Sequence, residues 1–272
     1  MVNKCAKSGY DDYIEYTDIY DIIGSIGIIE NIEINKNIDY IDTSDIIEKF
    51  GCIDNMDYPM KITVYCRKGS AGKTPIAVNI ALDRGYALAT NEGDNILDQI
   101  IPEDRLITIE PSERFPTFPP DIEIVFDLAG VLSREASPSI TSAVEQSNVV
   151  LVPIYNELKC LNAGLSTIRE ILPHNVNIVV VATKLQKQKH ESFSDWRDSA
   201  DFKNVSNVIH SEINPRIPIF PLKFSKVFDT IFEKEKSISQ LRATDMLAKY
   251  AYRDVSAQFD DLLTYVEKNH AS

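Results

Sequence analysis

The feature that most constrains the fold is a series of short apolar runs that alternate with helical segments from residue 60 onward. The runs are rich in Val and Ile, as is typical of strands covered on both faces of a sheet. They lie at 61–66, 86–91, 122–128, 148–154, 177–183 and 217–222, and the helical segments at 74–84, 137–147, 162–172, 195–213 and 238–268. This alternation predicts an α/β domain over residues 59–272, with a doubly wound, mostly parallel sheet.

Residues 1–58 have a different character, because they are rich in Ile, Asp, Asn and Tyr. The stretch "NIEINKNIDYI" alternates apolar and polar residues around an Asn-Lys-Asn turn and predicts a hairpin. A short helix is expected in "TSDIIEKFG", capped by Thr43 or Ser44 and ended by Gly51. We interpret residues 1–58 as a small N-terminal appendage to the α/β domain.

The composition favours a protein of the cytoplasm. No apolar run approaches the roughly 20 residues that a membrane-spanning helix needs. The chain does not open on a charged segment followed by a long apolar core, so we expect no secretory signal. Its four cysteines, at positions 5, 52, 66 and 160, lack metal-ligand spacing and are expected to be reduced thiols.

The net charge of −13 is distributed unevenly along the chain. Residues 1–60 hold 13 acidic and 4 basic side chains, a balance of −9, and residues 61–183 hold 15 and 10, a balance of −5. Residues 184–272 hold 13 acidic and 14 basic side chains, a balance of +1. Any contact with a polyanion is therefore expected in the last third, since the first 60 residues would repel phosphates.

The stretch "VYCRKGSAGKTPIAVNIA" at 64–81 has the order strand, small-residue loop, helix. A phosphate-binding loop requires this order, because the loop amides and the helix N-terminus then point at one anion. Lys73 is expected to reach the β- and γ-phosphates, and the Thr74 hydroxyl to ligate Mg²⁺. Pro75 falls in the first helical turn, where a missing N–H costs nothing. The alternative is a surface turn with a solvated lysine.

The loop departs from the template GxxxxGK[ST], because Arg67 occupies the place of the first glycine. "RKGSAGKT" instead resembles the deviant Walker A motif, xKGGxGK[ST], of the ParA/MinD family of ATPases. In that comparison Lys68 is the signature lysine, which in the family reaches the nucleotide of the opposite subunit in an ATP-sandwich dimer. The alternative is a basic residue on a loop. The resemblance implies nucleotide contacts from Lys68, Gly69, Ser70, Ala71, Gly72, Lys73, Thr74 and Pro75.

The stretch "ATNEGDN" at 89–95 lies where the family has an acidic-x-acidic motif. The resemblance implies that Asp94 helps to position the attacking water and that its neighbour Glu92 belongs to the Mg²⁺ site. The helix before this strand is about three residues shorter than is usual in the family, so a register error of two residues stays open. A polar turn without catalytic function is the other interpretation.

"IEIVFDLAG" at 122–130 resembles a Walker B strand followed by switch II. A carboxylate at the carboxyl end of a buried strand lies beside the phosphate loop in this fold, so Asp127 is expected to hold the Mg²⁺ shell. The resemblance implies that Gly130 offers an amide to the γ-phosphate. It also assigns the adenine pocket to Thr183 and Lys184 after the fifth strand and to Pro221 and Leu222 after the sixth, although these positions could simply end strands.

Residues 139–172 follow the helix, strand and next helix of the compact ParF-type plasmid partition ATPases, and the whole resemblance covers roughly residues 60–240. It implies a slow, Mg²⁺-dependent ATPase with Lys68, Lys73, Asp94 and Asp127 as catalytic residues. ATP would drive formation of a homodimer, a centromere-binding (ParB-like) protein would stimulate turnover, and the protein would act at the nucleoid in partition of a plasmid or other replicon.

In partition ATPases the ATP-bound dimer binds DNA nonspecifically through basic residues of the C-terminal part. The candidates are Lys223, Lys226, Lys234, Lys236, Arg242, Lys249 and Arg253. Acidic residues are interleaved with them, so a charge-mixed helical surface is the alternative.

Two rival functions stay open. A MinD-like positioning ATPase at the membrane would need a basic amphipathic C-terminal helix, but "FDDLLTYVEKNHAS" is acidic on its polar side. The departures at Arg67, Ser70, Pro75 and Glu92 also fit a nucleotide-binding interaction protein with degenerate catalysis. Measured turnover separates this rival from the ATPase.

Overall fold

The computed structural model describes residues 59–93, 96–130 and 137–270. The predicted appendage at 1–58 and the predicted catalytic residue Asp94 lie outside the described residues. The described part forms a seven-stranded sheet, in which every pair of neighbouring strands is parallel, with the order β3-β2-β4-β1-β5-β6-β7. The strands are β1 (Lys61–Val64), β2 (Ala87–Thr90), β3 (Leu106–Thr108), β4 (Ile124–Asp127), β5 (Val149–Ile154), β6 (Ile178–Leu185) and β7 (Ile219–Lys223).

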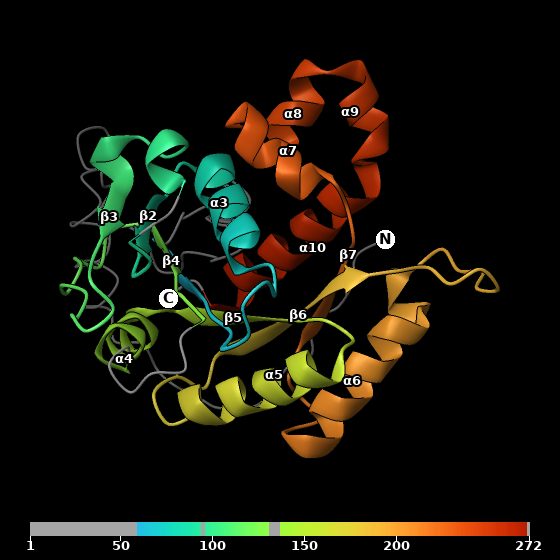
Figure 1. The fold of residues 1–272 in the computed structure, drawn as a ribbon, viewed down its shortest axis with the longest axis horizontal. Coiled ribbons are helices and arrows are strands. Elements are labelled where there is room, and N and C mark those ends of the chain that lie inside the picture. Colours follow the sequence, from blue (N-terminus) through green and yellow to red (C-terminus); the bar gives the residue numbers. More distant parts are fainter. Residues whose placement is uncertain (1–58, 94–95, 131–136, 271–272) are drawn as a thin grey trace, which may run out of the picture. The chain divides into compact units, whose positions relative to one another are not determined.

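Helices cover both faces of the sheet, with α5 and α6 on one side and α3 and α10 on the other (Figure 1). Three short 3₁₀ helices lie at Leu97–Gln99, Glu103–Arg105 and Trp196–Asp198. The α-helices are α3 (Lys73–Arg84), α4 (Ser137–Gln146), α5 (Leu158–Ile171), α6 (Ala200–Glu212), α7 (Val227–Lys234), α8 (Ile238–Thr244), α9 (Met246–Ala251) and α10 (Arg253–His270). Among these described helices, none combines the length and the apolar character needed to cross a membrane.

Alternate residues of the strands pack into two separate apolar layers. In β5, Val149 and Leu151 pack with α3, α7, α8 and α10, whereas Val150 and Val152 pack with α4, α5 and α6. Successive side chains of a strand point to opposite faces, so a strand buried on both sides must be apolar throughout. This requirement explains the nearly continuous Val and Ile runs.

The strand order makes the carboxyl ends of β1 and β4 the natural place for a ligand. After β1 the chain crosses to β2 on one side, and after β4 it crosses to β5 on the other side of β1. Ligands bind in open α/β sheets at such a switch point, beyond the carboxyl ends of the strands. Val64, the last residue of β1 before the predicted phosphate-binding loop, pairs in register with Asp127.

The predicted fold class is confirmed, and each of the six predicted strands matches a strand within about three residues at each end. The sequence interpretation missed β3 and α7. β3 is a three-residue, partly exposed edge strand, too short to produce an apolar run. α7 has apolar residues at 227, 228, 231 and 232, a helical spacing that the sequence did carry.

Candidate functional site

The loop at 67–72 joins β1 to α3, and two of its residues adopt left-handed backbone conformations. Gly72 precedes α3 with φ +98°, and Ser70 has φ +61°. Only glycine adopts the first of these without strain. Lys73 opens α3 with 8% of its surface exposed, and its Nζ donates a long hydrogen bond of 3.4 Å to the Lys68 carbonyl. Among the described residues, this is the only hydrogen bond of the Lys73 ammonium.

Gly130 lies against this lysine. A methyl group at Gly130 would lie 3.0 Å from Lys73 Nζ and 3.2 Å from the carbonyl oxygens of Arg67 and Cys66. These oxygens belong to the backbone and cannot move aside as a flexible side chain would. A larger residue here would force the segment after β4 and the loop apart by a few tenths of an ångström, so glycine suits this close approach.

Asp127 ends β4 beside the loop with only 2% of its surface exposed. Neither carboxylate oxygen has a hydrogen-bond partner among the described residues. Burial raises the pKa of Asp127 from the ordinary 3.8 to about 6, and the neighbouring Thr74 hydroxyl and Lys73 ammonium oppose the rise. A buried carboxylate without hydrogen bonds is costly, so a water, an ion or a ligand is expected to satisfy it.

These residues fit Mg²⁺ better than a metal bound by protein ligands alone. Within the described ranges, no group of three or more His, Cys, Asp or Glu side chains could enclose a metal ion. Mg²⁺ sites of nucleotide-binding proteins use one or two carboxylates, while phosphate oxygens and waters complete the shell. Asp127, with the nearby Thr74 hydroxyl, supplies such a partial set.

Arg67, the residue that departs from the Walker template, ties the loop to α5. Its backbone N–H donates to Thr167 Oγ1 at 3.0 Å, and its Nε lies 3.6 Å from Glu170 Oε2. Both side chains of this ion pair are about one third exposed, at 32% and 35%. The ion pair gives the arginine a structural role at the start of the loop.

Residues near the carboxyl end of β6 hold the far side of the same loop. Thr183 Oγ1 donates to the Ala71 carbonyl at 3.0 Å, and Lys184 Nζ donates to the Ser70 carbonyl at 2.6 Å. The Lys184 ammonium also lies 4.8 Å from the centre of the Tyr155 ring. Two residues predicted for the adenine pocket therefore contact the predicted phosphate-binding loop in this structure.

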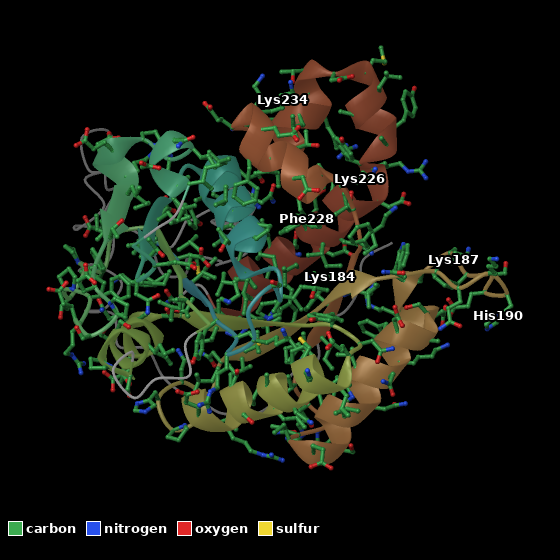
Figure 2. The ribbon with its side chains drawn as sticks, in the orientation of Figure 1. Lys184, Lys187, His190, Lys226, Phe228 and Lys234 are labelled. Atoms are coloured by element: carbon green, nitrogen blue, oxygen red, sulfur yellow. The ribbon has the colours of Figure 1, made fainter. Side chains whose placement is uncertain are left out.

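A cavity of about 580 Å³ opens between the loop, the ends of β4 and β6, and α7. Figure 2 shows Lys184 and Phe228 on the elements that border it. Its walls include the predicted residues Gly69, Ser70, Gly72, Lys73, Thr74, Pro75, Glu92, Gly130, Thr183, Lys184 and Leu222. The structure therefore brings most of the predicted site residues to one cavity.

Four predicted residues do not line this cavity. Ala71 and Pro221 are buried, and Asp127 is also buried, beside Lys73 and Thr74. Lys68 is half-buried and offers its carbonyl to Lys73. Of the acidic pair, Glu92 is exposed at the cavity, and Asp94 stays a prediction because it lies outside the described residues.

The sequence interpretation missed six residues that line the cavity. They are Ile76, Ala129, Phe224, Ser225, Phe228 and Asp229. Four of the six follow β7 or belong to α7, the helix that was not predicted. Its helical spacing was the available signal.

The predicted DNA-binding side chains differ in their availability. Lys223 pairs with Asp254 at 3.2 Å, Arg253 pairs with the same carboxylate, and Arg242 donates to Ser256 Oγ. Lys226, Lys234, Lys236 and Lys249 are exposed and form no ion pair with another described residue. Four of the seven candidates thus remain free to contact a polyanion.

One solved structure is similar to this chain in fold, and two others match less closely. No family model and no curated protein matches the sequence. An ATP complex of McdA from Cyanothece is similar at TM-score 0.50 and 11% identity, over 75% of this chain and 95% of that one. The cell division ATPase MinD of Pyrococcus furiosus is similar at TM-score 0.46 and 14% identity, over 74% of this chain and 98% of that one. A plasmid partition protein of Borrelia burgdorferi is similar at TM-score 0.40 and 14% identity, over 65% of this chain and 97% of that one. At these identities the likeness is one of fold.

Proposed function

We propose that this chain, which has the fold of the ParA/MinD-type ATPases, is a Mg²⁺-dependent ATPase whose ATP-driven dimerisation acts in DNA partition. The observation that carries the proposal is the presence of two buried charged groups at one place. Lys73 has one long hydrogen bond with a described residue, and the Asp127 oxygens have no hydrogen-bond partner among the described residues. Both lie where the loop after β1 meets the end of β4. A nucleoside triphosphate with its Mg²⁺ would satisfy both groups, because its phosphates would bind Lys73 and the ion would bind Asp127.

The residues would act by positioning and by neutralising charge, as is general in phosphoryl transfer. Lys73 would bind the β- and γ-phosphates, and the loop amides from Gly69 to Thr74 would surround them. Asp127 and Thr74 would hold Mg²⁺, with Glu92 at the cavity edge, and the ion would supply charge neutralisation at the phosphates. Asp94 is proposed to orient the attacking water. The base would occupy the end of the cavity that includes Leu222 and Phe228.

Lys68 is proposed to complete the site of a second copy of this chain in an ATP-bound homodimer. Its ammonium is absent from the walls of its own cavity, while its backbone carbonyl accepts from Lys73. The side chain is therefore available for another role, although its carbonyl is in use.

A Lys68→Ala variant is expected to bind Mg²⁺-ATP like the wild type, because alanine keeps the carbonyl that Lys73 uses. Turnover is expected to fall by about 100-fold, the typical effect of removing one donor that stabilises the charge of a transition state. Light scattering with a nonhydrolysable ATP analogue should detect wild-type dimers and variant monomers. The control is Lys203→Ala, which removes a lysine paired with Asp198 on the surface. Full dimerisation and turnover by Lys68→Ala would refute the sandwich arrangement.

The proposed DNA contact lies in the last third of the chain. β6 and β7 are parallel neighbours, so the segments that follow them start at the same edge of the sheet. Lys187 and His190 follow β6, and Lys226 and Lys234 lie just before and at the end of α7 (Figure 2). Lysines on neighbouring segments without ion pairs suit the sequence-independent attraction of a phosphate backbone.

The double variant Lys226→Ala/Lys234→Ala is expected to sediment less with DNA in the presence of Mg²⁺-ATP. The slope of log affinity against log salt should become shallower by roughly two, about one per lost phosphate contact. The matched control is Lys159→Ala, an exposed lysine of α5 on the other face of the sheet. An unchanged salt slope would place DNA elsewhere. Sedimentation with anionic liposomes instead of DNA would favour the positioning ATPase.

A further inference from the structure

Asn91, the residue directly after β2, is fully buried and joins two neighbouring elements. Its Oδ1 accepts a hydrogen bond of 2.7 Å from the Ala129 N–H after β4. Its Nδ2 donates one of 2.8 Å to Ser139 Oγ in α4. Both ends of the amide are therefore used, and their directions fix which end is oxygen.

The chain of hydrogen bonds continues beyond Asn91. Ser139 Oγ, which is also buried, donates to the Pro111 carbonyl at 2.9 Å. The bonds thus run in one direction, from the Ala129 N–H through Asn91 and Ser139 to the backbone after β3. A buried network in which each member is satisfied holds its geometry more rigidly than a single bond.

This network fixes the residue next to Gly130. Gly130 follows Ala129 and lies so close to the loop that a methyl group there would be 3.0 Å from Lys73 Nζ. The position of the Ala129–Gly130 peptide relative to the Lys73 ammonium therefore depends on the hydrogen bond that the Ala129 N–H donates to Asn91 Oδ1.

We propose that Asn91 is a positioning residue for the terminal phosphate, which it acts on by holding the Ala129–Gly130 peptide against Lys73. The inference rests on the proposed function, in which Gly130 offers its amide to the γ-phosphate. ADP lacks that phosphate, so Asn91 contributes to the discrimination of ATP from ADP.

The alternative is that Asn91 only stabilises the junction of β2, β4 and α4. The two roles differ in what they do to nucleotide affinity. A structural defect weakens ATP and ADP binding together, because both nucleotides use Lys73 and the loop amides. A displaced Gly130 weakens only the nucleotide that carries a γ-phosphate. The ratio of the two affinities therefore separates the roles.

The experiment measures the affinities of the full chain for Mg²⁺-AMPPNP and Mg²⁺-ADP by calorimetry in wild type, Asn91→Leu and Ser139→Ala. Asn91→Leu keeps the side-chain size and removes both hydrogen bonds. It is expected to bind AMPPNP about tenfold more weakly, roughly the worth of one hydrogen bond to a charged phosphate, with ADP affinity within about twofold. Ser139→Ala leaves the acceptor for Ala129 and should give a smaller shift in the same direction.

The matched control is Asn175→Leu, which removes two bonds from Asn175 Nδ2 to the Val144 and Ser147 carbonyls at the opposite end of α4, and the bond that the Asn177 N–H donates to Asn175 Oδ1. It is expected to lower thermal stability and leave the affinity ratio unchanged. An unchanged ratio in Asn91→Leu, or in Ser139→Ala if the first variant does not fold, would overturn the inference. A folded wild type that binds neither nucleotide would instead refute the proposed function, and the inference with it.

Discussion

A Lys73→Ala variant is expected to bind Mg²⁺-ATP at least about 100-fold more weakly than the wild type while keeping its fold. Lys73 is the buried cation of the cavity, and its only hydrogen bond with a described residue is the long one to the Lys68 carbonyl. Lys73 therefore gives up little interaction within the protein when it binds phosphate, and most of the energy of the new contact contributes to nucleotide affinity. A charge-assisted contact in a partly desolvated cavity is stronger than one in water.

Calorimetry or fluorescent-nucleotide titration measures this affinity, and circular dichroism checks the fold. The matched control is Lys61→Ala, a half-buried lysine of β1 whose Nζ donates to the Phe118 carbonyl. Lys61 opens the strand at the end away from the loop, so its loss should leave nucleotide affinity unchanged. Wild-type affinity in Lys73→Ala would mean that the loop at 67–72 does not bind phosphate.

An Asp127→Asn variant is expected to be more stable than the wild type without nucleotide and almost inactive with it. Burial raises the pKa of Asp127 to about 6, so at pH 7.5 the native state carries an unfavourable charge. Asparagine has nearly the same shape and no charge. The free energy of unfolding should rise by about 1–3 kcal/mol, which corresponds to several degrees in Tm. Turnover should fall by about 100-fold because the Mg²⁺ shell loses its buried carboxylate.

The pH dependence of the stability gain has a definite sign. The pKa of Asp127 is higher in the folded state, about 6, than the ordinary 3.8, so the native state binds the proton more tightly. The wild type therefore loses stability as pH rises between these two values. The gain from Asp127→Asn should be small near pH 4 and fully developed above pH 7.

Thermal unfolding at several pH values without nucleotide measures this gain, and the exposed Asp121→Asn is the control. A variant that is less stable than the wild type at neutral pH would show that the Asp127 carboxylate has stabilising partners in the apo protein. Retained turnover in Asp127→Asn would show that Asp127 does not hold the Mg²⁺ ion.

The sequence was sufficient to predict the strands at the centre of the sheet. It was insufficient to predict the edge strand β3 and the helix α7, which borders the cavity. β5 and β6 are buried on both faces over Val149–Ile154 and 178–182, so these residues are apolar and produce a clear run in the sequence. β3 is short and partly exposed, and an edge strand of three residues leaves no such pattern. α7 was missed although its apolar residues have helical spacing, because a segment of eight residues is a weak signal.

Predictions for the site succeeded in placing residues where the loop sequence itself dictates geometry. A glycine before the helix and a lysine in its first turn need only local structure to reach one cavity. Contacts between distant segments could not be derived in this way. The hydrogen bonds of Thr183 and Lys184 to the loop and the bond from Ala129 to Asn91 depend on strand order. Nothing in the local sequence around residue 91 shows that its side chain meets β4.

The most direct test of the central claim is phosphate release from Mg²⁺-ATP by the wild-type chain, measured beside Lys73→Ala, with and without DNA. The account predicts saturable binding and slow release by the wild type, and neither by Lys73→Ala. Binding without release under all conditions, including an added partner protein, would contradict the enzyme and leave a nucleotide-binding interaction protein. Absence of ATP binding by folded wild-type protein would contradict the whole assignment.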